Sequence, residues 1–492
     1  MELGTIRWTD RLPPEVWQIV LSFTTFGTNR NCLSVSKLFH NLAARMLFSS
    51  LRIQFGSWRI ALRCGPGKPS AEESFTNVCK PYDVLLRVIN DPVFASYIKH
   101  VDILPFGRMV AESKICTLTQ AVSAMYNLRS FTWHNWNQVY MFPSSQLLET
   151  LASKCGHLRE YKLPFQSLHM LHALQSMPAT DIYLCRYDRG ASEFEEELYD
   201  AHRESFVSLL EARRGSLAQL SLSSPGIRDC PTYILQDLTH LTICIDEERN
   251  IAVIFRHCTR LEALFLEITK DIPHTVFTAA IAEDPSALPL LTHLKVFPSP
   301  GCNREDSWPI ANFIRSKKKL RCLDYVDKFN SIMQQSRVLS AIKSLSTLEV
   351  LGLSFTQEIL EPIEWTFLTR TIPRTVTALR LSVDYDDLGR HCEWIDLWAS
   401  LPRLSFAHVA DLRFHPIVGT RALAAAAKSL RLVGHHSYFR EVYRTGDKVT
   451  FSKPWSPTKV KFRMAAEFGC DDWEWLMRDH RLQWILRDSV GH

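Results

Sequence analysis

The sequence lacks the patterns that would place it in a membrane or outside the cell. In 492 residues no apolar run reaches the roughly 18 residues of a membrane-spanning helix, the N-terminus has no apolar signal stretch, and no Asn-x-Ser/Thr glycosylation site occurs. The 13 cysteines are scattered singly, without a Cys-x-x-Cys pair, which indicates free thiols and no zinc framework. We therefore expect an intracellular protein, in the cytoplasm, the nucleus or both, without a membrane partner.

An excess of one charge is also lacking. Lys and Arg number 57 and Asp and Glu 52, so the net charge of +5 is too small over this length to indicate a nucleic-acid partner. Hydrophobic residues make up 46% and charged residues 22%, as in ordinary globular proteins with a large core. The length alone suggests about three domains.

Motifs for catalysis, cofactors and metals are missing as well. No Gly-x-Ser-x-Gly elbow occurs, and Gly65-Pro-Gly-Lys68 lacks the first Gly and the Ser/Thr of a phosphate loop. His391 and the pair His435-His436 lack the spacing of metal ligands. We interpret the acidic groups at 193–197, 384–387 and 471–474 as solvated faces. The sequence thus predicts a protein that is not an enzyme and has no cofactor or metal.

The first fifty residues predict a small helical unit. Pro13, Pro14 and Glu15 are typical of a helix start, and apolar residues then recur at helical spacing from Val16 to Phe23. A second apolar stripe runs from 39 to 47. A unit of roughly forty residues cannot bury a strong core alone, so its spare apolar faces should pack on a partner or on the rest of the chain.

The order of these residues resembles an F-box. The matching stretches are Leu12-Pro-Pro-Glu-Val-Trp-Gln-Ile-Val-Leu21, Leu33-Ser-Val-Ser-Lys-Leu-Phe39 and Leu47-Phe-Ser-Ser-Leu-Arg-Ile53, although the loop 24–31 lacks the usual Leu and Asp. The resemblance implies three helices that bind a Skp-type adaptor and, through it, a cullin. It implies adaptor contacts at Leu12, Pro13, Glu15, Val16, Ile19, Val20, Leu33, Val35 and Lys37. The alternative is an ordinary N-terminal helical cap.

From residue 98 onward one pattern returns twelve times, an apolar residue, two others, an apolar residue, one other and an apolar residue. At 46% apolar content the bare pattern is common by chance, but Leu fills eight first and eight middle positions and the period stays near 28 residues. The units start at Ile98, Leu128, Leu158, Ala179, Leu217, Leu238, Leu261, Leu291, Leu320, Leu348, Val376 and Val409.

Segments of helical character, such as 146–155 and 331–342, separate these predicted strands. The alternation resembles an irregular leucine-rich-repeat solenoid, an α/β fold with parallel strands on its concave face. A doubly wound sheet is the alternative, but twelve units exceed its usual size. The predicted domains are an F-box at 1–54, a helical connector with an exposed loop at 55–97, the solenoid at 98–432, and a hairpin with a Trp-rich cap at 433–492.

In such repeats the residue between the second and third apolar positions faces the concave side. We expect a recognition row there, formed by Asp102, Thr132, Lys162, Tyr183, Thr242, Phe265, Lys295, Asp324, Arg380 and Arg413. The target-binding candidates are Tyr183, Phe265, Lys295, Asp324, Arg380 and Arg413, with the two aromatic side chains as exposed anchors.

Two further segments leave alternatives open. The tryptophans at 455, 473, 475 and 484 indicate either a cap on the last repeat or a Trp-rich binding surface. The basic cluster at 315–321 indicates a solvated helix end or a nuclear signal.

These features together predict the substrate-recognition subunit of an SCF-type ubiquitin ligase, which binds an unknown protein target. The alternatives are a repeat scaffold that acts outside ubiquitin ligation, and an enzyme built on the repeat array.

Overall fold

The computed structural model describes two compact units. Unit 1 comprises 1–61 and 69–216, and unit 2 comprises 62–68 and 217–492. The described residues are 12–24, 26–55, 71–105, 112–134, 142–185, 192–245, 249–268, 274–297, 307–327, 332–333, 335–359, 362–384, 391–411, 420–446, 448–455, 459–460, 465–478 and 480.

Unit 1 begins with the three predicted short helices, α1 (Pro14–Ser22), α2 (Phe26–Cys32) and α3 (Lys37–Leu47). Pro13 precedes α1, and the Ser36 hydroxyl caps α3 by accepting a hydrogen bond from the Phe39 N–H at 3.3 Å. The Trp17 and Phe39 rings meet edge to face at 5.0 Å and hold α1 against α3.

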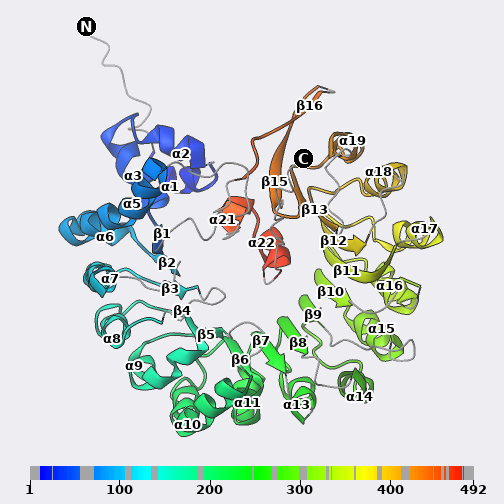
Figure 1. Ribbon diagram of the computed structural model, residues 1–492, viewed down its shortest axis with the longest axis horizontal. Helices are drawn as coiled ribbons and strands as arrows, with labels where there is room; N and C mark the ends of the chain where they lie inside the picture. The colour runs from blue at the N-terminus through cyan, green and yellow to red at the C-terminus, as the bar shows by residue number, and fades with distance from the viewer. Residues whose placement is uncertain are drawn as a thin grey trace. The chain divides into compact units, whose positions relative to one another are not determined.

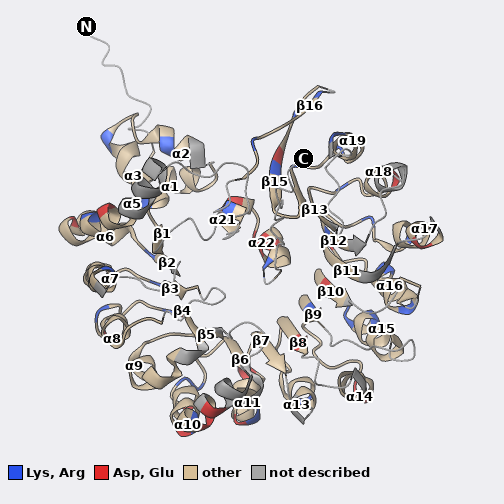
Figure 2. Cartoon of the chain, in the orientation of Figure 1, with Lys and Arg blue, Asp and Glu red and all other residues tan. Residues whose placement is uncertain are grey.

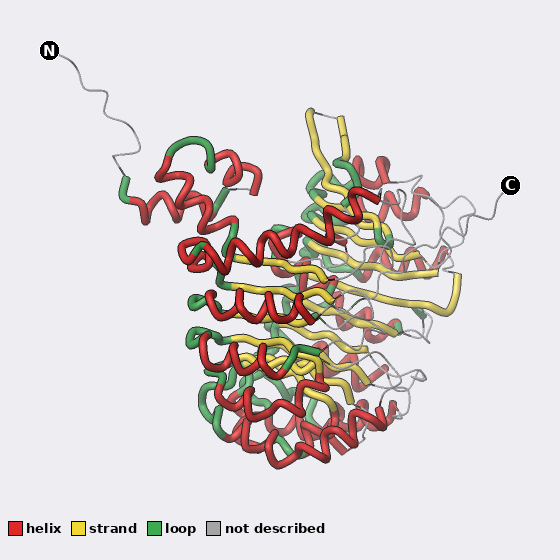
Figure 3. Tube along the Cα trace, turned by 60° about the vertical axis from the view of Figure 1, so that its left-hand side comes forward, coloured by secondary structure: helices red, strands yellow, loops and turns green. Residues whose placement is uncertain are grey.

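The rest of unit 1 alternates strands with helices. Five strands pair in chain order, and every described pairing is parallel. They are β1 (Ser50–Phe55), β2 (His100–Pro105), β3 (Ser130–Trp133), β4 (Glu160–Pro164) and β5 (Asp181–Cys185). The connecting helices are α5 (Ala71–Asn90), α6 (Pro92–Tyr97), α7 (Glu112–Ala124), α8 (Ser145–Lys154), η2 (Phe165–Met170), α9 (Leu171–Ser176) and α10 (Ser192–Glu211), and they lie on one side of the strands (Figure 3).

Unit 2 continues the same alternation with β6 to β14 in parallel. Its strands are β6 (Gln219–Ser223), β7 (His240–Ile245), β8 (Ala263–Ile268), β9 (His293–Phe297), β10 (Cys322–Asp327), β11 (Val350–Ile359), β12 (Ala378–Asp384), β13 (Phe406–Asp411) and β14 (Leu432–His435). Its helices are α11 (Ser224–Arg228), α12 (Thr232–Asp237), α13 (Arg249–His257), α14 (His274–Glu283), α15 (Ser307–Ser316), α16 (Ser336–Lys343), α17 (Pro362–Thr371), α18 (His391–Ala399) and α19 (Thr420–Ala426).

Unit 2 ends with the predicted hairpin and two short helices. β15 (Tyr438–Thr445) pairs antiparallel with β14 and with β16 (Lys448–Phe451), and Gly446 in the turn has a φ of +59°. The helices α21 (Ala465–Phe468) and α22 (Asp471–Met477) lie on the strand side, opposite the outer helices (Figure 1). Among the described residues no helix is long and apolar enough to cross a membrane.

The repeat pattern places the core between strands and helices. In a unit such as Leu320-x-x-Leu323-x-Tyr325, the three apolar side chains are at most 1% exposed, whereas alternate residues point to the other face. The fold is therefore a leucine-rich-repeat-like α/β solenoid within each unit. Acidic and basic residues are interspersed over its helices (Figure 2).

The structure corrects the ends of the predicted repeat series. β1 precedes the first predicted strand, so the array begins within the segment assigned to the F-box. The twelfth unit is in the wrong register, because Ala407 pairs with Leu379 and Val409 with Leu381, which makes the unit Leu404-x-x-Ala407-x-Val409. Both registers fit the apolar pattern of the sequence, and only the strand pairing decides between them. β14 adds one further unit at the other end.

Candidate functional site

An exposed apolar surface lies on the N-terminal helices of unit 1. Large apolar side chains of α1 and its flanks are 37% to 86% exposed, and Val35 before α3 is 65% exposed. We call this set the docking surface: Leu12, Val16, Ile19, Val20, Phe23 and Val35. Scattered single apolar residues are normal on a protein surface, but six within 24 residues make this surface a candidate interaction site.

The docking surface remains exposed because residues outside it make the contacts between the N-terminal helices. Leu21 is buried, and its carbonyl accepts hydrogen bonds from Asn29 Nδ2 at 3.3 Å and from the Thr24 hydroxyl at 2.8 Å. The Thr24 hydroxyl also contacts Asn29 Oδ1 at 2.8 Å. The face of α1 that carries Leu21 therefore packs within the helical unit, and the apolar stripe from Val16 to Phe23 remains uncovered.

The other predicted adaptor contacts lie at the same end of unit 1. Pro13, Glu15 and Lys37 are exposed, and Leu33 is half-buried. Their roles in adaptor binding stay predictions.

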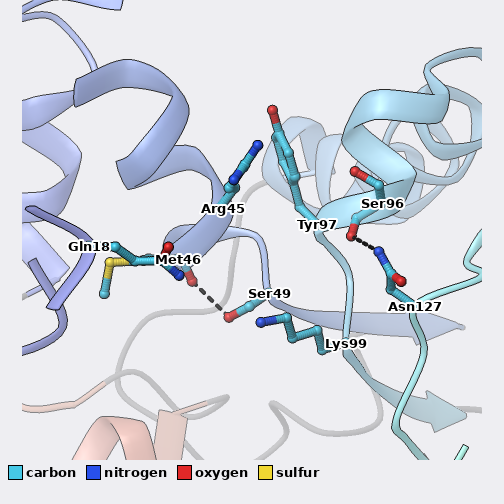
Figure 4. Close-up of a pocket in the computed structure, with 8 residues that line it drawn as sticks. All are labelled: Gln18, Arg45, Met46, Ser49, Ser96, Tyr97, Lys99 and Asn127. Atoms are coloured by element: carbon cyan, nitrogen blue, oxygen red, sulfur yellow. Dashed lines mark hydrogen bonds between the residues drawn. The ribbon is translucent and has the colours of Figure 1, made fainter. Parts of the chain in front are cut away.

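A recess of about 470 Å³ lies beside these helices (Figure 4). Arg45 and Lys99 make it basic, and the Arg45 guanidinium lies 5.8 Å from the centre of the Tyr97 ring. The Ser49 hydroxyl donates to the Met46 carbonyl at 2.8 Å, and Asn127 Nδ2 donates to the Ser96 carbonyl at 2.8 Å. The Ser49 and Asn127 side chains are thus used in hydrogen bonds to the backbone. None of the predicted site residues lines the recess.

The predicted recognition row is continuous in unit 2 where strand register can be followed. Phe265, Lys295, Asp324, Gly352, Arg380 and His408 stand at successive paired positions on β8 to β13. Lys295, Asp324 and Arg380 are 1%, 0% and 5% exposed, because α22 and His480 cover β10 to β12. We call these three residues with His480 the buried charge cluster.

Asp324 is the centre of the buried charge cluster. Its Oδ2 accepts a hydrogen bond from His480 Nε2 at 2.5 Å and lies 3.5 Å from Lys295 Nζ, while Arg380 Nη1 lies 3.8 Å from Oδ1. Arg380 Nη2 donates to His480 Nδ1 at 2.7 Å. Because His480 accepts at Nδ1 and donates at Nε2, its imidazole is neutral.

Covering groups from the C-terminal segment complete this arrangement. Lys295 Nζ donates to the Arg478 carbonyl at 2.7 Å and lies 4.9 Å from the centre of the Trp475 ring. Asp324 reaches Arg380 across β11, and only a glycine at 352 leaves room for it. A Cβ on Gly352 would lie 2.7 Å from Asp324 Cγ and closer still to Oδ1.

The electrostatics follow from this burial. Burial alone would raise the pKa of Asp324, but His480, Arg380 and Lys295 together lower the pKa of the carboxyl below its usual range. Burial, together with Arg380, lowers the pKa of His480 to about 3, against the attraction of Asp324. The cluster is thus one carboxylate, two cations and a neutral histidine.

The expectation of an exposed recognition row is wrong at Lys295, Asp324 and Arg380, because the C-terminal segment occupies that face. Tyr183 in unit 1 and Phe265 in unit 2 are half-buried rather than exposed, and Phe265 meets Phe297 edge to face at 5.0 Å. Arg413 lies outside the described residues, and strand register gives its place in the row to His408. Target binding by the six candidate residues stays a prediction.

A second row, which sequence reasoning missed, explains why the C-terminal segment lies there. The first residues of β10 to β14 are Cys322, Val350, Ala378, Phe406 and Leu432, and all of them pack with Trp473, Leu476 and Met477 of α22 in one apolar cluster. The corresponding residues of β6 to β9 are Gln219, His240, Ala263 and His293, so three of these four are polar. The change from polar to apolar at this position was the available signal.

No protein-family model and no curated protein matches this sequence. Among solved structures, a leucine-rich repeat-containing protein, LegL7 of Legionella pneumophila, matches 63% of this chain and 93% of its own at 12% identity and a TM-score of 0.36. A chain of the yeast Rad7 and Elc1 complex matches 75% of this chain and 93% of its own, at 12% identity and a TM-score of 0.43. Likenesses this distant carry no argument about function, and the leucine-rich-repeat-like fold rests on the strands and helices of this chain.

Proposed function

We propose that this chain is the substrate-recognition subunit of an SCF-type ubiquitin ligase inside the cell. In this proposal the docking surface binds a Skp-type adaptor, which joins the chain to a cullin, and the solenoid binds a protein target. The chain itself does no bond chemistry. The observation that carries the proposal is the docking surface, because its apolar side chains stand in the order of an F-box and remain uncovered in unit 1.

The test is co-purification of the full chain with a Skp-type adaptor. The double variant Leu12→Asp and Ile19→Asp should lose the adaptor, because each change places a carboxylate in the middle of an interface that must be dehydrated. Leu86→Asp is the matched control, since Leu86 lies on α5 and is 49% exposed. It should retain the adaptor.

Undiminished adaptor binding by the double variant would overturn the assignment of the docking surface. Affinity capture with the proteasome blocked tests the wider proposal, because a receptor should bring down adaptor, cullin and an accumulating client together. Capture of a client without adaptor or cullin would favour the alternative, a repeat scaffold that acts outside ubiquitin ligation.

A further inference from the structure

Three side chains with the chemistry of zinc ligands meet where α22 crosses the strands of unit 2. They are His293 on β9, Cys322 on β10 and Asp472 on α22, and their ligand atoms all lie within 4.8 Å of one another. His293 Nε2 is 3.8 Å from Asp472 Oδ1, and Cys322 Sγ is 3.9 Å from the same oxygen. Zinc bonds of about 2.0 to 2.3 Å in a tetrahedron place ligand atoms about 3.3 to 3.7 Å apart, so small movements complete the geometry.

The histidine is oriented as a metal ligand requires. Arg321 Nη2 can only donate and lies 3.3 Å from His293 Nε2, so Nε2 accepts and the ring N–H is on Nδ1, 2.8 Å from the Thr292 hydroxyl oxygen. The lone pair on Nε2 therefore points into the cluster. A ring N–H held by a second residue, with the other nitrogen directed at the ion, is typical of metal-binding histidines.

A cationic group already lies between two of these ligands, Asp472 and His293. Arg321 Nη2 is 2.8 Å from Asp472 Oδ1 and 3.3 Å from His293 Nε2, and Nη1 is 2.5 Å from Asp472 Oδ2. A metal ion would replace this guanidinium group, for which Glu349 Oε2, at 3.5 Å from Nη1, is an alternative partner. The site thus attracts positive charge, and Arg321 can pair with Glu349 when a metal ion displaces it.

The set of ligands selects the metal. A thiolate and an imidazole favour zinc over the oxygen-binding ions magnesium and calcium. When zinc binds, Cys322 loses its thiol proton to the solvent, and the thiolate and the Asp472 carboxylate balance the two positive charges. His293 and Asp472 are 22% and 24% exposed, so an ion can enter and a water molecule can be the fourth ligand.

We propose that His293, Cys322 and Asp472 bind a zinc ion that fastens α22 to β9 and β10. The ion would hold the C-terminal segment over the buried charge cluster and thereby keep Lys295, Asp324 and Arg380 covered. This proposal does not depend on the ubiquitin-ligase proposal, since it concerns unit 2 alone.

The test uses the full chain, stripped of metal with a chelator and titrated with Co²⁺, which reports thiolate coordination as a charge-transfer absorption band. The wild type should show the band, Zn²⁺ should abolish it by competition, and Cys322→Ser should lack it. Cys116→Ser is the matched control, because Cys116 is an exposed free thiol on α7 of unit 1. His293→Gln should weaken Zn²⁺ binding at least about tenfold.

Arg321→Gln separates a metal site from a merely structural cluster. Loss of the competing guanidinium should tighten Zn²⁺ binding several-fold, although the metal-free variant should be less stable because Asp472 loses its partner. If Cys322→Ser fails to fold, Asp472→Asn serves instead. Zn²⁺ at about 100 times its Kd should raise the Tm of the wild type by about 5 °C and that of Asp472→Asn by much less.

Three results would overturn the proposal. They are the absence of a thiolate band in the wild type, an equal band in Cys322→Ser, and equal stabilisation of wild type and Asp472→Asn by Zn²⁺. In the last two cases, binding would come from other cysteines or histidines of the chain.

Discussion

Replacing Gly352 with alanine tests whether the buried charge cluster needs the space that this glycine leaves for Asp324. The new methyl carbon would lie 2.7 Å from Asp324 Cγ, closer to Oδ1, and 3.0 Å from Leu476 Cδ1 of α22. Real Cβ contacts under 3.0 Å essentially never occur, so Asp324 must move. A displaced Asp324 loses Arg380 and His480, and at 0% exposure it gains no water in exchange.

The expected cost follows from that displacement. Breaking a buried ion pair costs about 3 to 5 kcal/mol, so we expect about 3 kcal/mol in the free energy of unfolding of unit 2. For a unit of this size that corresponds to a fall in Tm of about 6 °C, measured by calorimetry on the transition of unit 2. Gly156→Ala is the control, because nothing lies within 4 Å of its added methyl group.

A double-mutant cycle with Asp324→Ala shows whether the alanine acts through the carboxylate. The two changes should cost less together than the sum of their separate effects, because either one breaks the same ion pairs. A Gly352→Ala variant that melts within about 1 °C of the wild type would refute this account of the cluster.

Two further predictions concern the same region. His480 has a pKa of about 3 in the folded protein, where it is neutral, against 6.5 when free. Below pH 6.5 the unfolded chain therefore binds a proton that the folded chain does not. The free energy of unfolding should fall by about 1.4 kcal/mol per pH unit between these two pKa values. Calorimetry from pH 8 to 4 should therefore show the Tm advantage of wild type over His480→Gln shrinking on acidification, and a constant difference would contradict the neutral imidazole. Trp473→Ala should cost about 3 to 5 kcal/mol, because its ring is buried and stacks on Phe406 at 5.2 Å. Limited proteolysis should then cut the segment 465–480 faster, whereas Trp308→Ala, which removes a half-exposed ring on α15, should leave the cleavage rate unchanged.

The recognition row shows how far sequence reasoning reached into the site. The repeat pattern predicts that Lys295, Asp324 and Arg380 lie in one row, and strand register does align them. Their burial could not be read from the repeat, because the groups that cover them, Trp475 and His480, come from a segment about 100 residues or more away. A pattern within one repeat carries no information on such a contact.

The zinc-site ligands show the same limit more sharply. The sequence predicts no metal because His293, Cys322 and Asp472 follow no spacing motif. Two of them stand at equivalent positions of neighbouring strands, where parallel register brings together residues about one repeat apart. The third arrives only when α22 packs on the apolar row from Cys322 to Leu432.

The sequence by itself determined the repeated strand and helix, since the spacing of buried leucines is a local property of each unit. It also determined the short N-terminal helices and their apolar stripe. Only the tertiary structure decided which faces remain uncovered: the stripe on α1 stays exposed, while the charged row on β9 to β12 is closed by α22. The physical reason is that exposure depends on which distant segments find complementary apolar surfaces, and that choice is made by packing rather than by local spacing.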